Sequence, residues 1–253
     1  MNNADNRPIL VTGAAGAVEG IGRSLTENLL LKGRKVRALV RREDGRAEVL
    51  RKLGAEVIVG DLTDLASMYR AIQGVSGLYL GMSVSPSYLE ATVNTAAVAR
   101  HHRVGVIVNM SQMTVSQMSI TETTNSPQHK LHWLAEQTFE WSGLPVVTMR
   151  PTVFMEGFFL RFIAAGIRDN DEMILPLGNS KTSPVSARDV SDAIADILMN
   201  PAPHIGKRYN LTGPESQNME HYAQAFSRAL GKHVRYRNVH VAIWADDLRQ
   251  VEK

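Results

Sequence analysis

The sequence predicts an α/β fold: a doubly wound parallel sheet with a smaller C-terminal α/β lobe. Three observations predict it. Short apolar runs alternate with segments of helical period from Pro8 to Met149. These runs are nearly continuous, as in strands that helices cover on both faces. This alternation of apolar runs and helical segments changes after Pro151. Strand–helix alternation of this kind gives right-handed βαβ units and therefore parallel strands.

The strands of the first half follow from apolar, mostly β-branched runs. They are expected at 8–12, 35–40, 56–59, 77–82, 104–110 and 145–149. The helices between them follow from apolar residues three and four apart. Ile21, Leu25 and Leu29 predict a helix over 22–32, and Leu65, Met68 and Ile72 predict one over 65–72. The other helices are expected at 44–53, 88–103 and 127–141.

The second half predicts a different organisation. Helices are expected at 154–168, 189–199, 219–230 and 241–253, a strand at 208–211, and a loop at 173–179 because of its Pro and Gly. We therefore expect residues 1–151 to form one domain and 152–253 a smaller lobe that shares an interface with it. The last helix ends without a cap, so a longer natural C-terminus, or one completed by a partner subunit, is expected.

Composition excludes several classes of protein. The 253 residues are enough for one large domain with an attached lobe. The absence of cysteine excludes disulfide scaffolds, Cys-ligated zinc, iron–sulfur clusters and thiol nucleophiles, and it fits a cytoplasmic location. No signal peptide or membrane span is expected, because the start is polar and no apolar run approaches about 18 residues. The histidines lack metal-ligand spacing, so no metal is expected.

Basic residues concentrate near the second strand. Between Lys32 and Lys52 the sequence holds nine Lys or Arg and three acidic residues, although the net charge of the whole chain is only +3. Such a cluster is either a solvated surface or a site for a phosphate. A nucleic-acid surface is the weaker interpretation because no aromatic residues interleave the basic ones. No direct nucleic-acid partner is expected.

A glycine-rich loop joins the first strand to the first helix. Gly13, Gly16, Gly20 and Gly22 permit a tight turn and let backbone N–H groups approach a pyrophosphate at the helix N-terminus. The placement between a strand and a helix makes this signal stronger than the glycines alone. The spacing is irregular and indicates a three-residue insertion, which brings Glu19 near the pyrophosphate unless its side chain points outward.

The end of the second strand predicts the choice of nucleotide. An acidic residue there selects NAD, and an arginine pairs with the 2′-phosphate of NADP. Arg41 and Arg42 stand at this point, which favours NADPH over NADH. Asp61 and Leu62 are suited to contact the edge of the adenine ring. Asp61 is equally well placed to cap the N-terminus of the next helix. The expected cofactor-binding residues are Thr12, Gly13, Ala15, Gly16, Gly22, Arg41, Arg42, Asp61, Leu62, Gly81, Met82, Ser83 and Met110.

The sequence resembles the NmrA-like family, a branch of the atypical short-chain dehydrogenases/reductases. The matching segments include LVTGAAG, VRALVRR, EVIVGDLTD, the block HWLAEQTFEWSGLPVVTMRPTVFMEGFF, SARDVSDAIADIL and YNLTGPE, and they cover nearly the whole chain. The resemblance implies a Rossmann domain over residues 1–151 that binds NADP, and a small substrate-binding C-terminal lobe over residues 152–253. It also implies one of two activities, because some members reduce quinones or other small carbonyl compounds and others are redox sensors or partners of transcription factors.

The chain departs from the catalytic pattern of the short-chain reductases. Alignment on Glu136 puts Gln128 at the position of the catalytic Tyr and His132 at that of the Lys, while Ser111 keeps its place after the fifth strand. Gln has no titratable proton, so Gln128 cannot replace a Tyr as acid. His132 either hydrogen-bonds the nicotinamide ribose or relays a proton, or it is a packed helix histidine. Hydride transfer to a quinone needs less proton donation than ketone reduction, because aromaticity stabilises the product.

We therefore expect an NADPH-dependent reductase of a quinone or related flat aromatic carbonyl compound, in natural-product tailoring or elsewhere. The expected catalytic residues are His132, Ser111 and Gln128, and the expected substrate residues are Gln112, Met113, Phe154 and Phe158. The alternative is a non-catalytic NADP(H) sensor that acts through a protein partner. A homodimer is left open.

Overall fold

The computed structural model describes the backbone of residues 6–16 and 20–251, and their side chains except those of 158–160 and 247–251. The chain divides into two compact units. Unit 1 comprises Met1–Pro151 and Ala187–Leu211, and unit 2 comprises Thr152–Ser186 and Thr212–Lys253. Within the described residues, no helix is long and apolar enough to cross a membrane.

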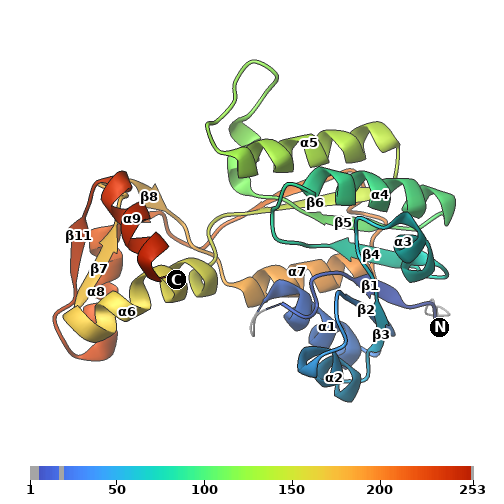
Figure 1. Ribbon diagram of the computed structural model, residues 1–253, viewed down its shortest axis with the longest axis horizontal. Coiled ribbons are helices and arrows are strands. Elements are labelled where there is room, and N and C mark those ends of the chain that lie inside the picture. Colours follow the sequence, from blue (N-terminus) through green and yellow to red (C-terminus); the bar gives the residue numbers. More distant parts are fainter. Residues whose placement is uncertain (1–5, 17–19, 252–253) are drawn as a thin grey trace. The chain divides into compact units, whose positions relative to one another are not determined.

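A seven-stranded parallel sheet forms the centre of unit 1 (Figure 1). Its strands are β1 (Ile9–Val11), β2 (Val36–Val40), β3 (Glu56–Val59), β4 (Gly77–Leu80), β5 (Ile107–Met110), β6 (Val146–Pro151) and β9 (Arg208–Leu211). They lie in the order β3-β2-β1-β4-β5-β6-β9. The order reverses direction between β1 and β4, and ligands of open α/β sheets bind outside the carboxyl ends of the strands at such a point.

Helices cover both faces of this sheet. The helices α1 (Ile21–Leu31), α2 (Gly45–Lys52) and α7 (Ala187–Met199) lie on one side. On the other side lie α3 (Leu65–Ile72), α4 (Tyr88–His101) and α5 (Pro127–Ser142), with the short 3-10 helix η1 (Met113–Gln117) before α5. The predicted doubly wound α/β class is confirmed.

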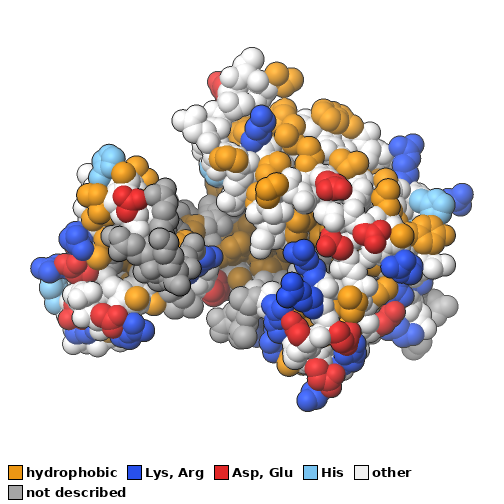
Figure 2. Space-filling model, in the orientation of Figure 1, with side chains coloured by type: hydrophobic (Ala, Val, Ile, Leu, Met, Phe, Trp, Pro, Cys, Tyr) orange, Lys and Arg blue, Asp and Glu red, His pale blue; other side chains and the backbone are white. Residues whose placement is uncertain are grey.

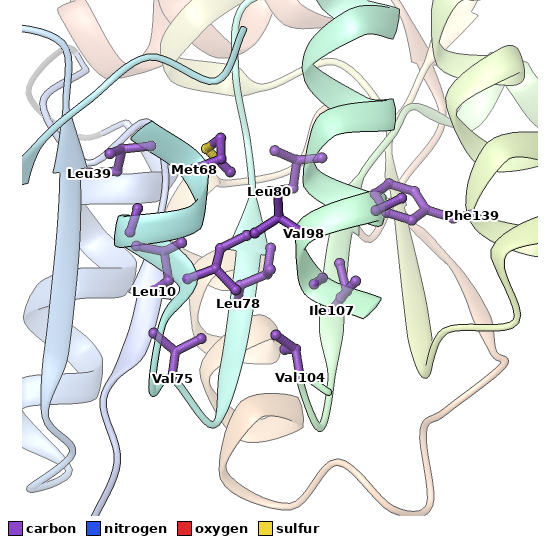
Figure 3. Close-up of a cluster of buried hydrophobic side chains, with 14 residues drawn as sticks. Leu10, Leu39, Met68, Val75, Leu78, Leu80, Val98, Val104, Ile107 and Phe139 are labelled. Atoms are coloured by element: carbon purple, nitrogen blue, oxygen red, sulfur yellow. The ribbon is translucent and has the colours of Figure 1, made fainter. Parts of the chain in front are cut away.

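One cluster of buried hydrophobic residues in unit 1 lies between the sheet and the second group of helices (Figure 3). Alternate strand residues face these helices, because successive side chains of a strand point to opposite faces. Leu78 and Leu80 of β4 and Ile107 of β5 thus meet Met68 of α3 and Phe139 of α5. All five side chains are at most 2% exposed. This packing fixes the strand ends that border the candidate site.

Unit 2 has its own small core and two short sheets. Its elements are the π-helix η2 (Met155–Leu160), α6 (Arg161–Asn170), β7 (Glu172–Leu175), β8 (Lys181–Thr182), β10 (Gln217–Asn218), α8 (Met219–Leu230), β11 (Arg235–Asn238) and α9 (Val241–Val251). Strand β7 pairs with β11 in parallel, and β8 pairs with β10 in antiparallel. Ile163 of α6, Met173 and Leu175 of β7 and Met219 of α8 are buried together.

Three expectations for the second half were wrong. Met173–Asn179 is not a single loop, because Glu172–Leu175 forms β7, which ends directly before Pro176. The helix expected over 154–168 does not begin at Phe154, because Phe154 pairs with Val185 in an isolated β-bridge. The strand Arg208–Leu211 does not belong to the smaller unit: as β9 it pairs with β6 and extends the central sheet.

Candidate cofactor site

A cavity of about 780 Å³ opens at the carboxyl ends of the strands of unit 1. The expected cofactor residues line it, except Gly22 and Met110. The lining residues are Thr12, Gly13, Ala15, Gly16, Leu39, Val40, Arg41, Arg42, Arg46, Gly60, Asp61, Leu62, Thr63, Gly81, Met82, Ser83, Ser85, Pro86 and Ser87. They lie at the ends of β1, β2, β3 and β4 or in the segments that follow, so the cavity spans the point where the strand order reverses.

The glycines of the first loop are needed for close backbone approach. Gly13 has a φ of +68°, and a Cβ there would lie 2.7 Å from the carbonyl oxygen of Gly81. A Cβ on Gly22 would lie 2.5 Å from the carbonyl oxygen of Gly13, so Gly22 packs α1 against the turn without reaching the cavity. Thr12 ties the same turn to β4: its hydroxyl donates to the Gly81 carbonyl at 2.9 Å and accepts from the Gly81 N–H at 2.8 Å.

The N-terminus of α1 is open to an anion. Gly20 is the N-cap, no side chain caps the helix, and its first turn contains no acidic residue. The first N–H groups of a helix are unpaired and carry partial positive charge, which favours a phosphate. Glu19 of the predicted three-residue insertion lies outside the described residues.

Three arginines that follow β2 also line the cavity. Arg41 lies 3.6 Å from the Asp61 carboxylate, and Arg46 pairs with Asp44 at 2.6 Å. Arg42 makes no ion pair with any residue that the structure describes. Figure 2 shows Lys and Arg side chains gathered on the part of unit 1 that carries α1 and α2. A free guanidinium beside two restrained ones suits a bound phosphate.

The acidic residues near these arginines hold the local backbone. Asp44 caps α2 by accepting from the N–H groups of Arg46 and Ala47, and the hydrogen bonds from Arg46 lower its pKa to about 2. Asp61 accepts from the N–H and hydroxyl of Thr63, and these hydrogen bonds lower its pKa, with a smaller effect of Arg41. Asp64, not Asp61, is the N-cap of α3. Both Asp44 and Asp61 are therefore held in the ionised form.

These residues fit a dinucleotide. The glycine turn lines the cavity, and the uncapped N-terminus of α1 that follows it suits a pyrophosphate. The arginines at the end of β2 suit a phosphate on the adenosine ribose. The segment 81–87 borders the cavity after β4, toward β5.

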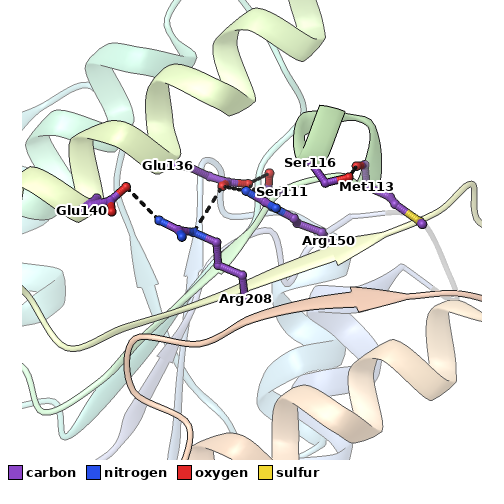
Figure 4. Close-up of polar contacts among 7 residues, drawn as sticks. All are labelled: Ser111, Met113, Ser116, Glu136, Glu140, Arg150 and Arg208. Carbon is purple, nitrogen blue, oxygen red and sulfur yellow. Dashed lines mark hydrogen bonds and ion pairs between the residues drawn. The ribbon is translucent and has the colours of Figure 1, made fainter. Parts of the chain in front are cut away.

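Ser111 is engaged in a buried polar cluster (Figure 4). Its hydroxyl donates to Oε1 of Glu136 at 2.5 Å, and Nε of Arg150 donates to the same oxygen at 2.9 Å. A second guanidinium nitrogen of Arg150 binds the other oxygen of Glu136. Arg208 joins from β9, bridging Glu140 at 2.8 Å and Glu136 at 3.9 Å. The hydroxyl proton of Ser111 is therefore already hydrogen-bonded to the Glu136 carboxylate.

His132 is buried, at 6% exposure, and contacts Tyr88. Its Nδ1 lies 3.0 Å from the Tyr88 hydroxyl, which also donates to the Met110 carbonyl at 3.2 Å. Burial lowers the pKa of His132 to about 4, with a smaller effect of His129, so the imidazole is neutral near pH 7. Burial also raises the pKa of Tyr88. Neither group is a strong acid near neutral pH.

The other expected catalytic and substrate residues are dispersed. Gln128 is exposed on the first turn of α5 and does not line the cavity. Gln112 and Met113, half-buried, lie directly after Ser111. Phe154 belongs to unit 2. The side chain of Phe158 lies outside the described residues.

Sequence reasoning missed two groups of residues. Arg46 is one of the nine basic residues between Lys32 and Lys52. It was not expected to line the cavity, because it lies inside the helix that follows the second strand. Ser85, Pro86 and Ser87 line the cavity, and Tyr88 follows them at the start of α4. The Ser-Pro-Ser run after the fourth strand was the available signal, because segments after the carboxyl ends of parallel strands line ligand sites.

The chain is similar to known proteins in sequence and in fold. The sequence profile of the NmrA-like family matches residues 5–252. The NAD(P)H azoreductase of Xenophilus azovorans is 28% identical over 96% of this chain and 79% of its own. The (4-alkanoyl-5-oxo-2,5-dihydrofuran-3-yl)methyl phosphate reductase of Streptomyces griseus is 31% identical over 92% and 77%. The crystal structure of an NADPH-dependent quinone oxidoreductase from Escherichia coli superimposes with a TM-score of 0.80 at 25% identity, covering 96% of this chain and 82% of that one.

Proposed function

Because this chain belongs to the NmrA-like family, we propose that it is an NADPH-dependent reductase that transfers hydride to a quinone or a related flat, conjugated acceptor. Three relatives support a reductase: an NAD(P)H azoreductase, a furanyl-methyl phosphate reductase and an NADPH-dependent quinone oxidoreductase. Their acceptors differ, so the acceptor class proposed for this chain rests on its own residues.

The observation that carries the proposal is the cavity at the switch point of the sheet. Its glycine turn and helix N-terminus would hold the pyrophosphate of the cofactor. Arg41, Arg42 and Arg46 would surround the 2′-phosphate, which supports NADPH over NADH. The chemistry that such a cofactor supplies when bound is a hydride from C4 of its dihydronicotinamide ring.

The acceptor class follows from the missing proton donors. Reduction of an ordinary ketone forms an alkoxide, which requires a positioned acid. Gln128 has no acidic proton, Ser111 donates to Glu136, and the His132 imidazole is neutral. A quinone accepts hydride to give an anion that aromaticity stabilises, and water can protonate it. We therefore propose conjugated acceptors whose reduced anion needs no protein acid.

Steady-state NADPH oxidation tests this function. The acceptors are naphthoquinone and phenanthrenequinone, with acetophenone as an aromatic ketone of similar size and NADH as the control donor. We expect turnover of the quinones with NADPH, at least tenfold lower kcat/KM with NADH, and no turnover of acetophenone. Turnover of acetophenone at the rate of the quinones would refute the acceptor class.

The second candidate is a non-catalytic NADP(H) sensor. The observation that favours it is the commitment of Ser111 to Glu136 and Arg150. A sensor requires that NADPH and NADP⁺ bind with different affinities and change a protein interaction. Calorimetric titration with both nucleotides separates the candidates: binding without oxidation by any acceptor favours the sensor, and equal affinities without a partner response exclude it.

A further inference from the structure

Two acidic residues, Glu43 and Asp44, follow the arginines at the end of β2, and neither lines the cavity. An acidic residue that faces the ribose after this strand accepts from its hydroxyls and selects NAD. Here both carboxylates bind arginines instead: Glu43 pairs with Arg51, and Asp44 pairs with Arg46. Of these two arginines, only Arg46 lines the cavity. Asp44 therefore acts on a residue that borders the candidate site.

The carboxylate of Asp44 holds Arg46 at both its backbone and its side chain. Oδ1 of Asp44 accepts from the backbone N–H of Arg46 at 2.9 Å and from that of Ala47 at 3.4 Å, which caps α2. Oδ2 accepts from Nε of Arg46 at 3.1 Å and from Nη2 at 2.6 Å. The low pKa of Asp44 keeps the carboxylate ionised at neutral pH. One carboxylate thus fixes both ends of the same arginine.

These contacts occupy only one edge of the Arg46 guanidinium. An arginine presents five N–H donors in a planar fork. Asp44 takes the Nε–H and one N–H of Nη2, which leaves both N–H groups of Nη1 and the second one of Nη2. Within the part of the chain that the structure describes, this guanidinium has no partner besides Asp44. Nη1 and Nη2 can therefore bind two oxygens of a phosphate side by side.

The Asp44 carboxylate has two opposite effects on an anion in the cavity. The Arg46 side chain is 63% exposed, so the surrounding protein restricts its rotamers little. Ordering such a side chain on binding weakens the affinity, and a side chain that is already ordered avoids this loss. The carboxylate also repels a phosphate nearby. Orientation of Arg46 lowers the Kd and repulsion raises it, so the sign of the change on removal of the charge separates the two effects.

We propose that Asp44 is a positioning residue that orients the guanidinium of Arg46 toward the 2′-phosphate of the nucleotide and thereby raises the preference for NADPH over NADH. This inference rests on the proposed nucleotide-binding function. Arg46 makes the contact with the phosphate, and Asp44 acts only through Arg46. An acidic residue after β2 thus favours the phosphorylated ribose, because it binds an arginine and does not face the ribose itself.

The side-chain N–H groups of arginine test the orientation without any nucleotide. A ¹H–¹⁵N spectrum in mildly acidic buffer detects Nε–H groups that exchange slowly with water, and Arg46→Lys assigns the signal. We expect a slowly exchanging Nε–H for Arg46 in the unmodified protein and its loss in Asp44→Asn. Asn is as good an N-cap as Asp, but it presents an amide N–H₂ in place of Oδ2. Persistence of the signal in Asp44→Asn would overturn the proposal.

Calorimetric titration with NADPH and NADH tests the consequence for binding. We expect Asp44→Asn to raise the Kd of NADPH about threefold to fivefold, the range of an exposed ion pair, and to leave the Kd of NADH unchanged. Arg46→Ala should raise the Kd of NADPH about tenfold. In the Arg46→Ala background, Asp44→Asn should have no further effect, because Asp44 acts through Arg46. A lower Kd of NADPH in Asp44→Asn would show that repulsion dominates and would overturn the proposal.

Asp64→Asn is the matched control. Asp64 caps α3 in the same way, by accepting from the N–H groups of Ala66 and Ser67, and it has no arginine partner among the described residues. We expect this variant to change neither Kd. An equal rise in the Asp44 and Asp64 variants would indicate a general effect of helix capping and would overturn the proposal.

The remaining failures are distinguishable. Losses that add up in the double variant would show that Asp44 acts independently of Arg46, which would also overturn the proposal. Equal losses for NADPH and NADH in Asp44→Asn would overturn the role in specificity. Absence of NADPH binding to the unmodified protein would refute the proposed function itself, whereas the arginine spectra would still decide whether Asp44 orients Arg46.

Discussion

Arg42 differs from its neighbours at the level of single side chains, because Arg41 and Arg46 pair with Asp61 and Asp44. A charge-assisted hydrogen bond to phosphate contributes about 1.5–3 kcal/mol. We expect Arg42→Ala to raise the Kd of NADPH at least about tenfold and to change the Kd of NADH less than twofold, by calorimetric titration. Arg51→Ala is the control, because Arg51 pairs with Glu43 and Glu48 outside the cavity. Equal losses for both nucleotides would contradict a 2′-phosphate site.

The low pKa of His132 predicts a loss of stability in acid. The folded pKa is about 4 and the unfolded value is 6.5, so the unfolded chain binds more protons between these values. The free energy of unfolding should thus fall as the pH drops from 6.5 to 4, by up to about 3 kcal/mol from this residue. Urea unfolding at several pH values measures it. His132→Asn should flatten the dependence, and the same substitution at exposed His233 should not.

The Glu136 carboxylate is the most buried charge of the polar cluster. Its side chain is 1% exposed and that of Arg150 15% exposed. Removal of one partner from a buried pair leaves an unpaired charge and costs about 3–5 kcal/mol. We expect Glu136→Gln to lower the free energy of urea unfolding by about 3 kcal/mol. Glu140→Gln, which affects the exposed pair with Arg208, should cost less than about 1 kcal/mol. Similar small losses in both variants would show that burial does not matter here.

Among the elements, the junction of β1 and α1 has no room for an added side chain. A Cβ on Gly22 would lie 2.6 Å from the carbonyl carbon of Gly13, so the helix and the turn must separate. We expect Gly22→Ala to weaken NADPH binding by more than tenfold, measured by fluorescence titration. Gly45→Ala is the control, because a Cβ at the start of α2 meets nothing within 4 Å. An unchanged Kd in Gly22→Ala would mean that the pyrophosphate does not bind at this turn.

The strands and helices also show which parts of the fold could be predicted from the sequence. Local signals located the strands of unit 1, because each is an apolar run bounded by turn residues. Asp44 was expected near the start of a helix and is its N-cap. Strand β7 was missed because Pro176 and Gly178 follow it closely and because its partner β11 lies about sixty positions later. Pairing at such a distance leaves no local pattern around the charged residues Arg235 and Arg237.

Side-chain partners at the candidate site were even harder to predict. The sequence placed Ser111 after the fifth strand, but its bond to Glu136 depends on the packing of α5 against β5 and β6. Tyr88 looked like an ordinary helix residue, and only the fold brings it to His132, 44 positions later. The backbone course of a βαβ unit is local, whereas the identity of a buried polar partner is not.

On the scale of the whole molecule, every residue that lines the cavity belongs to unit 1. A ligand that binds only the folded state stabilises it, by about 2.7 kcal/mol at a hundred times its Kd. We expect saturating NADPH to slow amide hydrogen exchange at 12–16, 39–46, 60–63 and 81–87, measured by mass spectrometry. The β7–β11 pair of unit 2 is the internal reference. Equal protection of both regions would contradict a site confined to the cavity.

The return of residues 187–211 to unit 1 has a consequence for synthesis on the ribosome. Strands β1 to β6 emerge first, but β9 covers the β6 edge, and α7 packs against α1. A nascent chain that has reached Pro151 therefore exposes an unpaired strand edge until Leu211 has left the exit tunnel. Exposed edges recruit other chains. A pause in translation between these two positions would leave the growing chain open to aggregation, and chaperones would matter most in that interval.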